Sequence, residues 1–136
     1  MTSYPIAKIE GIGPTYAEKL KLVGITNTNK YLDKAKDAAG RKAIEEETGT
    51  DHARILKWAN MADLMRIKGV GEEYSELLEA AGVDTVKELR NRNAANLTGA
   101  MKQANAEKKL VRQVPALSNV ENWIAQAKQL PPMMTY

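Results

Sequence analysis

Two short segments carry the residue types that a phosphate-binding turn requires. The sequence reads Gly-Ile-Gly at residues 11–13 and Gly-Val-Gly at residues 69–71. Glycine permits backbone conformations with positive φ and lets a ligand approach the bare main chain. We expect a helix directly after each segment, and the first turn of a helix offers free N–H groups and the positive end of its dipole. Both segments are therefore candidate phosphate sites.

Carboxylates that could hold catalytic metal ions are present but poorly grouped. Cleavage of a phosphodiester bond generally requires two metal ions held by several convergent carboxylates. Residues 45–47 are three consecutive glutamates, which a helix would point in different directions, and Asp63 is a further isolated candidate. Glu72, Glu76 and Glu79 share one face of a predicted helix, which we interpret as a solvated acidic surface. We therefore expect no catalytic residue and no enzymatic activity.

Other residue types exclude several further kinds of active site. The 136 residues include no cysteine and one histidine, His52. Disulfides, thiolate metal sites and histidine metal cages are thereby excluded, and we interpret His52 as a surface residue. No apolar run approaches the roughly 20 residues of a membrane span, and residues 1–8 lack the apolar core of a signal peptide. We expect a cytoplasmic protein with no membrane contact and no small-molecule substrate.

An internal repeat organises the chain. Residues 9–13 match residues 67–71, which lie 58 positions later. A tyrosine, a leucine and another glycine follow each segment at this same offset. The matched pairs are Tyr16 with Tyr74, Leu20 with Leu78, and Gly24 with Gly82. We therefore expect two related helical units, residues 1–60 and residues 61–136.

The apolar pattern is helical throughout, and no segment alternates as a half-buried strand requires. We expect the helix after each Gly-x-Gly segment to end at Gly24 or Gly82, and another helix over residues 38–48. Side chains that could cap further helices are Asp51, Thr85, Asn93 and Ser118. Trp58 and Trp123 are predicted to anchor the core, whereas Met133 and Met134 follow two prolines and are expected to form a frayed end.

Both Gly-x-Gly segments resemble the helix-hairpin-helix motif. They read Ile-Glu-Gly-Ile-Gly-Pro-Thr-Tyr-Ala-Glu-Lys-Leu from residue 9 and Ile-Lys-Gly-Val-Gly-Glu-Glu-Tyr-Ser-Glu-Leu-Leu from residue 67. In that family, such hairpins bind the DNA backbone without reading its sequence. Nearly all of the chain, including residues 63–71, also resembles a bacterial family of uncharacterised small proteins often labelled flap-endonuclease-like. The resemblance implies an all-α fold of two tandem helix-hairpin-helix-containing repeats, packed into one compact helical body.

The hairpin resemblance assigns roles to residues of the first segment. It implies phosphate-facing amides at Gly11, Gly13 and Tyr16, with Lys8 and Lys19 as nearby positive charges. Some hairpins of this type also hold a monovalent cation, Na⁺ or K⁺, through carbonyls of the turn. The carbonyls in question are those of Ala7, Ile9 and Ile12. No other cofactor or metal is expected.

The second segment departs from the family's chemistry. The corresponding residues are Lys68, Gly69, Gly71 and Tyr74. Glutamates at residues 72, 73 and 76 follow them in the first turn of the next helix. These carboxylates stabilise the helix dipole, but they repel a phosphate at the position where it would sit. We therefore expect the second segment to bind phosphate more weakly than the first, and to act mainly as a helix-packing joint.

Charge is unevenly distributed along a chain whose net charge is only +3. Residues 67–89 carry two basic and six acidic residues, whereas residues 90–136 carry seven basic and two acidic ones. Most of these basic residues lie between positions 90 and 112, and they are Arg90, Arg92, Lys102, Lys108, Lys109 and Arg112. Lys108 and Arg112 would share one face of a helix. This basic tail is either a solvated surface or a patch that completes a polyanion footprint or docks an acidic protein.

Two functions follow from these features. The first is a non-enzymatic module that holds duplex or flap-like DNA through its phosphates, without sequence specificity. The alternative is a protein-interaction or scaffolding module in which the hairpin fold has lost its phosphate site. The weak net charge and the acidic second segment favour this alternative.

Overall fold

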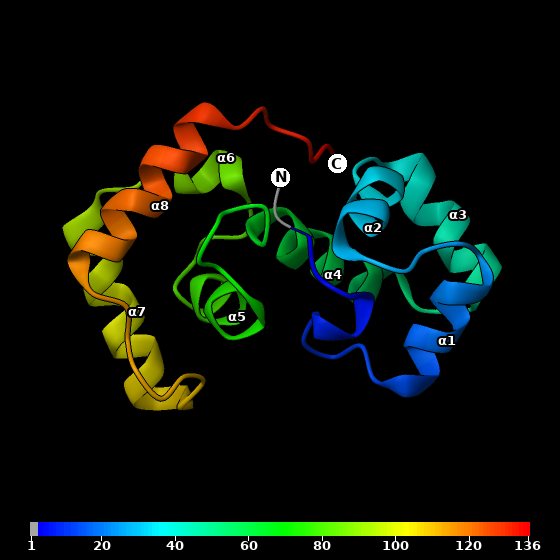
Figure 1. The fold of residues 1–136 in the computed structure, drawn as a ribbon, viewed down its shortest axis with the longest axis horizontal. Helices are drawn as coiled ribbons and strands as arrows, with labels where there is room; N and C mark the ends of the chain where they lie inside the picture. The colour runs from blue at the N-terminus through cyan, green and yellow to red at the C-terminus, as the bar shows by residue number, and fades with distance from the viewer. Residues whose placement is uncertain (1–2) are drawn as a thin grey trace.

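The computed structural model describes residues 3–136, and the fold in this range is all-α, as predicted (Figure 1). A single 3-10 turn precedes the α-helices. The elements are η1 (Ile6–Lys8), α1 (Pro14–Leu22), α2 (Thr28–Ala35), α3 (Ala38–Thr48), α4 (His52–Leu64), α5 (Glu72–Ala80), α6 (Val86–Leu89), α7 (Ala94–Lys108) and α8 (Leu117–Gln129). Residues 3–136 contain no strand, and Pro5 and Asn27 form one isolated β-bridge. No helix in this range is both long and apolar enough to cross a bilayer.

Most helix ends lie where the sequence predicts them. The side chains of Asp51, Thr85 and Asn93 accept backbone N–H groups at the starts of α4, α6 and α7, which confirms these three caps. Ser118 is not a cap. Helix α8 begins one residue earlier, because the Asn119 side chain accepts the N–H of Ala116 at 3.2 Å.

Helix α2 was not predicted from the sequence. Its first residues are Thr-Asn-Lys, and the Asn27 side chain caps it by accepting the Lys30 N–H at 2.8 Å. The helix buries Tyr31, Leu32 and Ala35 against its neighbours. It packs on α3 and α4. Burial by tertiary contacts therefore stabilises a segment whose local propensity is weak.

Two hydrophobic cores fill the molecule. The first extends from Ile6 to Met65 and contains Trp58; the second extends from Leu64 to Ala127 and contains Trp123. Both tryptophans are buried, as predicted. Figure 1 shows α1, α2 and α3 on one side, α6, α7 and α8 on the other, and α4 and α5 between them. The division into two units at residue 60 stays a prediction.

A buried ion pair lies where the two cores meet. Asp63 and Arg66 are 1% and 3% exposed, and Asp63 Oδ1 lies 2.8 Å from Arg66 Nη1. The second carboxylate oxygen accepts the Val86 N–H at 2.9 Å, and Arg66 Nη2 donates to the carbonyl of Pro131 at 2.7 Å. The pair therefore joins the end of α4 to the start of α6 and to the segment after α8.

Residues 130–136 form a strap that returns from α8 to the first core. The expectation of a frayed end is wrong, because Met133 and Met134 are half-buried against that core. The Thr135 N–H donates to the carbonyl of Lys36, and the Thr135 carbonyl accepts a hydrogen bond from Arg41, both at 2.8 Å. Figure 1 shows the strap as the red segment that runs from α8 toward α2. Its polar backbone is held by donors and acceptors of distant elements.

We predict that Asp63→Ala lowers the free energy of unfolding by about 3–5 kcal/mol, because Arg66 is left buried without its partner. The double variant Asp63→Ala with Arg66→Met removes both charges, and its loss should be smaller than the sum of the two single losses. Urea denaturation followed by circular dichroism measures all three. A loss below about 1 kcal/mol for Asp63→Ala would contradict a structural role for the pair.

Candidate functional site

The two Gly-x-Gly segments form turns of the same shape, which we call the first turn (residues 9–13) and the second turn (residues 67–71). Gly11 and Gly69 have φ angles of +94° and +99°, in the region that favours glycine. The apolar residues between the glycines, Ile12 and Val70, are buried. Each turn is therefore fixed by one left-handed glycine and one apolar residue that points into the core.

A tryptophan packs against the glycine of each turn. A Cβ at residue 11 or residue 69 would lie 3.1 Å from an indole Nε1, which is closer than normal contact. The tyrosine after each turn packs on the same tryptophan, with ring centroids 5.1 and 5.3 Å apart. These contacts join Gly11 and Tyr16 to Trp58, and Gly69 and Tyr74 to Trp123. Sequence analysis identified the tryptophans as core residues but missed that they hold the turns.

The indole N–H of Trp58 is directed at the first turn. The Cβ position at Gly11 lies 3.1 Å from Nε1 but 4.0 Å from Cε2, so it lies close to the line of the N–H bond. Trp58 is 2% exposed, and its N–H donates no hydrogen bond within residues 3–136. The indole nitrogen of Trp123 lies at the same 3.1 Å from a Cβ at Gly69, so this contact is common to both turns.

The start of α1 has no side-chain cap. Its N-cap is Gly13, whose backbone is extended, and α5 after the second turn begins in the same way at Gly71, whereas side chains cap α2, α3, α4, α6 and α7. Within the described residues, the N–H groups of Gly11, Gly13 and Tyr16 make no hydrogen bond. Both glycines are exposed. The predicted amides are therefore brought together and left free at the positive end of the helix.

Two cations flank the tyrosine of the first turn. Lys19 Nζ and Arg54 Cζ each lie 5.7 Å from the centroid of the Tyr16 ring. Arg54 comes from α4 and was missed by sequence analysis, because nothing local connects residue 54 to residue 16. It also pairs with Asp51 at 2.7 Å, and hydrogen bonds from its backbone N–H and its guanidinium lower the pKa of Asp51.

The Lys8 side chain lies beside α5 and not at the first turn. Its Nζ lies 3.7 Å from Glu72 Oε1, at the first residue of α5. Of the two lysines assigned to the first turn, Lys19 therefore remains beside Tyr16, and Lys8 reaches toward the second turn. The Ile9 carbonyl, one of the three expected to hold a monovalent cation, accepts the Ile12 N–H at 3.0 Å. The cation site that it would form with the carbonyls of Ala7 and Ile12 stays a prediction. No group of three side chains able to hold a metal ion occurs in the described part of the chain.

A side chain of α8 binds the backbone of Lys68 in the second turn. The Gln126 carboxamide accepts the Lys68 N–H at 2.9 Å and donates to the Lys68 carbonyl at 3.0 Å. The Tyr74 hydroxyl donates to the Gln113 carbonyl at 3.1 Å. At the first turn, the residue three positions after the tryptophan is Met61, which offers no such bonds. The N–H groups of Gly69, Gly71 and Tyr74 make no hydrogen bond in the described residues, so Gln126 binds Lys68 and leaves these three amides free.

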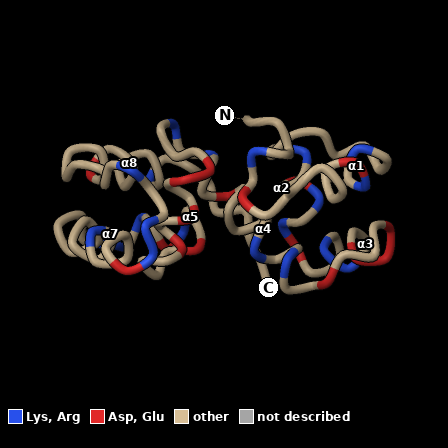
Figure 2. The backbone as a smooth tube through the Cα atoms, turned by 90° about the horizontal axis from the view of Figure 1, so that it is seen from below, with Lys and Arg blue, Asp and Glu red and all other residues tan. Residues whose placement is uncertain are grey.

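The acidic face of α5 is half-buried and faces lysines from other elements. Glu79 Oε1 lies 3.8 Å from Lys57 of α4, and Lys8 of η1 approaches Glu72. Burial raises the pKa of Glu76 and Glu79, and Lys57 and Lys108 oppose this shift. The expectation of a freely solvated acidic surface is therefore wrong. Figure 2 shows the acidic residues of α5 between α7 and the first half of the chain.

The basic tail is not one continuous patch. Helix α7 ends at Lys108, and Lys109 has a left-handed backbone, so Lys108 and Arg112 do not share a helical face as expected. Arg90 is half-buried and donates to carbonyls at the end of α8, where it holds the fold together. The exposed members that remain are Lys102, Lys108, Lys109 and Arg112.

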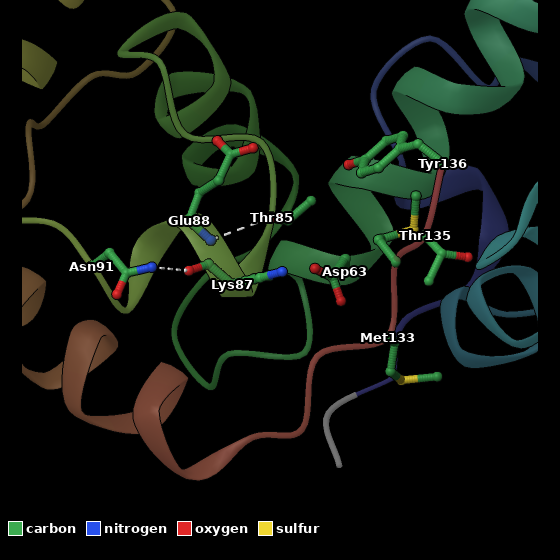
Figure 3. A pocket seen from close by; sticks show the side chains of 9 residues that line it. Asp63, Thr85, Lys87, Glu88, Asn91, Met133, Thr135 and Tyr136 are labelled. Atoms are coloured by element: carbon green, nitrogen blue, oxygen red, sulfur yellow. Dashed lines mark hydrogen bonds between the residues drawn. The ribbon is translucent and has the colours of Figure 1, made fainter.

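A cavity of about 520 Å³ lies between the strap and α6 (Figure 3). Its walls include Asp63 and Thr85, whose polar side chains already cap or pair within the fold. Tyr136 closes the opposite side, and burial together with Glu88 raises its pKa. None of the residues predicted to bind phosphate lines this cavity, so it is not the site indicated by the sequence.

The chain belongs to the DUF4332 family, described as a domain of unknown function, whose model matches residues 10–130. No curated protein and no solved structure matches it. The match covers most of the first turn, all of the second turn and every helix from α1 to α8, but it assigns no activity.

We predict that Glu76→Gln weakens the dependence of stability on pH. A carboxyl whose pKa is raised by folding stabilises the native state below its unfolded pKa, and this contribution is lost as pH rises through the folded pKa. The wild type should therefore gain thermal stability between pH 7 and pH 5 relative to Glu76→Gln. Melting curves followed by circular dichroism measure this difference, with Glu121→Gln on α8 as control. Parallel curves for wild type and Glu76→Gln would contradict the burial of Glu76.

Proposed function

We propose that this protein is a non-enzymatic module that binds the phosphate backbone of duplex or flap-like DNA through the first turn. The observation that carries the proposal is the uncapped start of α1, where the amides of Gly11, Gly13 and Tyr16 are free. Such a helix start is complementary to a phosphate, because its N–H groups and its dipole both favour negative charge.

Charge near the first turn supports binding but not sequence readout. Lys19 and Arg54 flank Tyr16. Amides and lysines reach phosphate oxygens, whereas reading a sequence requires contacts to base edges. We therefore propose binding without sequence preference, through one backbone-binding site in each chain. The second turn is not part of this proposal, because Glu72 and Glu73 in the first turn of α5 repel a phosphate there.

A protein-interaction module remains the second candidate. Leu22, the last residue of α1, is 86% exposed, which is unusual for a large apolar side chain in this fold. Several lysines are also engaged within the molecule, as Lys8 and Lys57 pair with glutamates of α5. A partner that contacts the end of α1 would explain the exposed leucine, and DNA would not.

We predict salt-sensitive binding of any DNA sequence. If the site neutralises about 2–4 phosphates, log K should fall against log salt with a slope of roughly −2 to −4. Fluorescence anisotropy of labelled duplex, flap and single-stranded DNA at several salt concentrations measures this slope. Two unrelated duplex sequences should give the same affinity. If micromolar protein at low salt gives no change in anisotropy, the protein-interaction function is the better candidate.

A pair of matched substitutions tests which turn binds. Gly13→Asp would cap α1 as Asp37 caps α3, and it would place a carboxylate where the phosphate is expected. Neither Gly13 nor Gly71 has positive φ. A Cβ added at residue 13 would meet no atom within 4 Å, and one added at residue 71 would meet only the Tyr4 hydroxyl, at 4.0 Å. Both variants should therefore fold, with stability raised by a few tenths of a kcal/mol.

The two variants should differ in DNA affinity. We expect Gly13→Asp to weaken binding about tenfold or more, equivalent to roughly 1.4 kcal/mol. Gly71→Asp carries the same charge and should weaken binding less than about threefold. Equal losses, or a loss confined to Gly71→Asp, would show that the first turn is not the site.

A further inference from the structure

The cavity between the strap and α6 has the size and the position of a small-molecule site. Its volume is about 520 Å³, and such sites usually have roughly 300–1,000 Å³. Its walls include Asp63, at the point where the two hydrophobic cores meet, together with residues of α6 and of the strap. Ligand pockets are common where separately packed parts of a protein meet.

The wall formed by the strap is held in place by contacts with the first core. The Tyr136 hydroxyl donates to Asn60 Oδ1 at 3.1 Å. The Thr135 carbonyl accepts a hydrogen bond from Arg41 at 2.8 Å, and the Arg41 guanidinium lies 5.6 Å from the centroid of the Tyr136 ring. A cavity whose walls are already ordered loses less free energy when it binds a ligand.

One positive and one negative side chain of α6 line the cavity without a charged partner. Lys87 and Glu88 form no ion pair within residues 3–136. The third charged residue of the lining, Asp63, is already paired with Arg66 at 2.8 Å. One Glu88 oxygen accepts the Asp84 N–H at 3.0 Å, and the other accepts no hydrogen bond in this part of the chain. The lining therefore offers one ammonium and one carboxylate, which complement a ligand that carries both charges.

The strap supplies an apolar surface to the same cavity. Met133 and Met134 line it and are half-buried against the first core. Figure 3 shows Met133 and Tyr136 on the strap, across the cavity from Lys87 and Glu88 on α6. A ligand that places its charged groups against α6 can therefore pack an apolar side chain on the flexible thioethers of the methionines.

We propose that this cavity binds a free amino acid with an apolar side chain. The ammonium group of the ligand pairs with Glu88, its carboxylate pairs with Lys87, and its side chain packs on Met133 and Met134. The ligand is bound and not converted, so no catalytic residue is required. The inference is independent of the proposed DNA function, because no residue of the first turn lines the cavity.

Three small molecules with the same branched carbon skeleton test the proposal on the wild-type protein. Leucine carries both charges, 3-methylbutylamine only the positive one, and 4-methylpentanoate only the negative one. We expect leucine to bind with a Kd of about 1 mM or lower. Each analogue should bind about tenfold more weakly, because it leaves Lys87 or Glu88 without a partner.

The methyl NMR signals of the methionines report the affinity and the position of the ligand together. Leucine should shift the signals of Met133 and Met134, and should leave unchanged the signal of Met101, which is buried in the second core. If leucine at about 10 mM shifts neither Met133 nor Met134, the inference is wrong. Equal affinities for leucine and 3-methylbutylamine would also overturn it, because the carboxylate would then not be recognised.

Two substitutions assign the charged groups. Glu88→Gln keeps an oxygen that can accept the Asp84 N–H, and it should weaken leucine binding about tenfold without weakening 4-methylpentanoate. Lys87→Gln should likewise weaken leucine about tenfold without weakening 3-methylbutylamine. Glu121→Gln, on α8 and outside the cavity, is the control and should leave all three affinities unchanged. Leucine affinities of Glu88→Gln and Lys87→Gln equal to that of the control would refute the pairing.

Discussion

The buried pair of Asp63 and Arg66 is the joint on which the arrangement of the two cores depends. Taking two charges out of water is costly, and further hydrogen bonds to both partners offset part of this cost. Both carboxylate oxygens are satisfied, and the guanidinium also reaches Pro131. One point therefore fixes the end of α4, the start of α6 and the strap. With these fixed, α5 lies beside η1 and α4, which brings its glutamates to lysines of the first half.

Local signals in the sequence predicted most of the helices. Positive-φ glycines and capping side chains act within four residues, so Asp51 and Gly24 could be read without knowledge of the fold. Helix α2 and the strap could not be, because their stability comes from burial and from donors far along the chain. Ser118 was wrongly predicted to cap α8, because two neighbouring polar side chains could form the bond at the start of this helix. Asn119 was the better hydrogen-bonding partner, and a sequence does not show which of two polar neighbours wins.

The candidate site also combines local features, which the sequence predicts, with contacts between distant residues, which it does not. The free amides of Gly11, Gly13 and Tyr16 follow from the turn itself, and sequence analysis named all three. Arg54, Gln126 and the pairing of Lys8 with Glu72 are contacts between distant elements. The carboxamide of Gln126 lies 58 residues from the backbone that it binds. The sequence already distinguishes the two turns by the glutamates after the second one, and the packing of α8 adds that Gln126 binds the backbone of Lys68.

The strap has a consequence for the order in which the protein can be completed during synthesis. Arg41 is buried with its guanidinium bound to a carbonyl 94 residues later, and the Lys36 carbonyl accepts the N–H of that same residue. The first core therefore lacks part of its cover until residue 135 has left the ribosome. Contacts of such long sequence separation form late, because the loop between them must close first. The N-terminal half thus emerges early, but the cover of its core is completed only when the strap is in place.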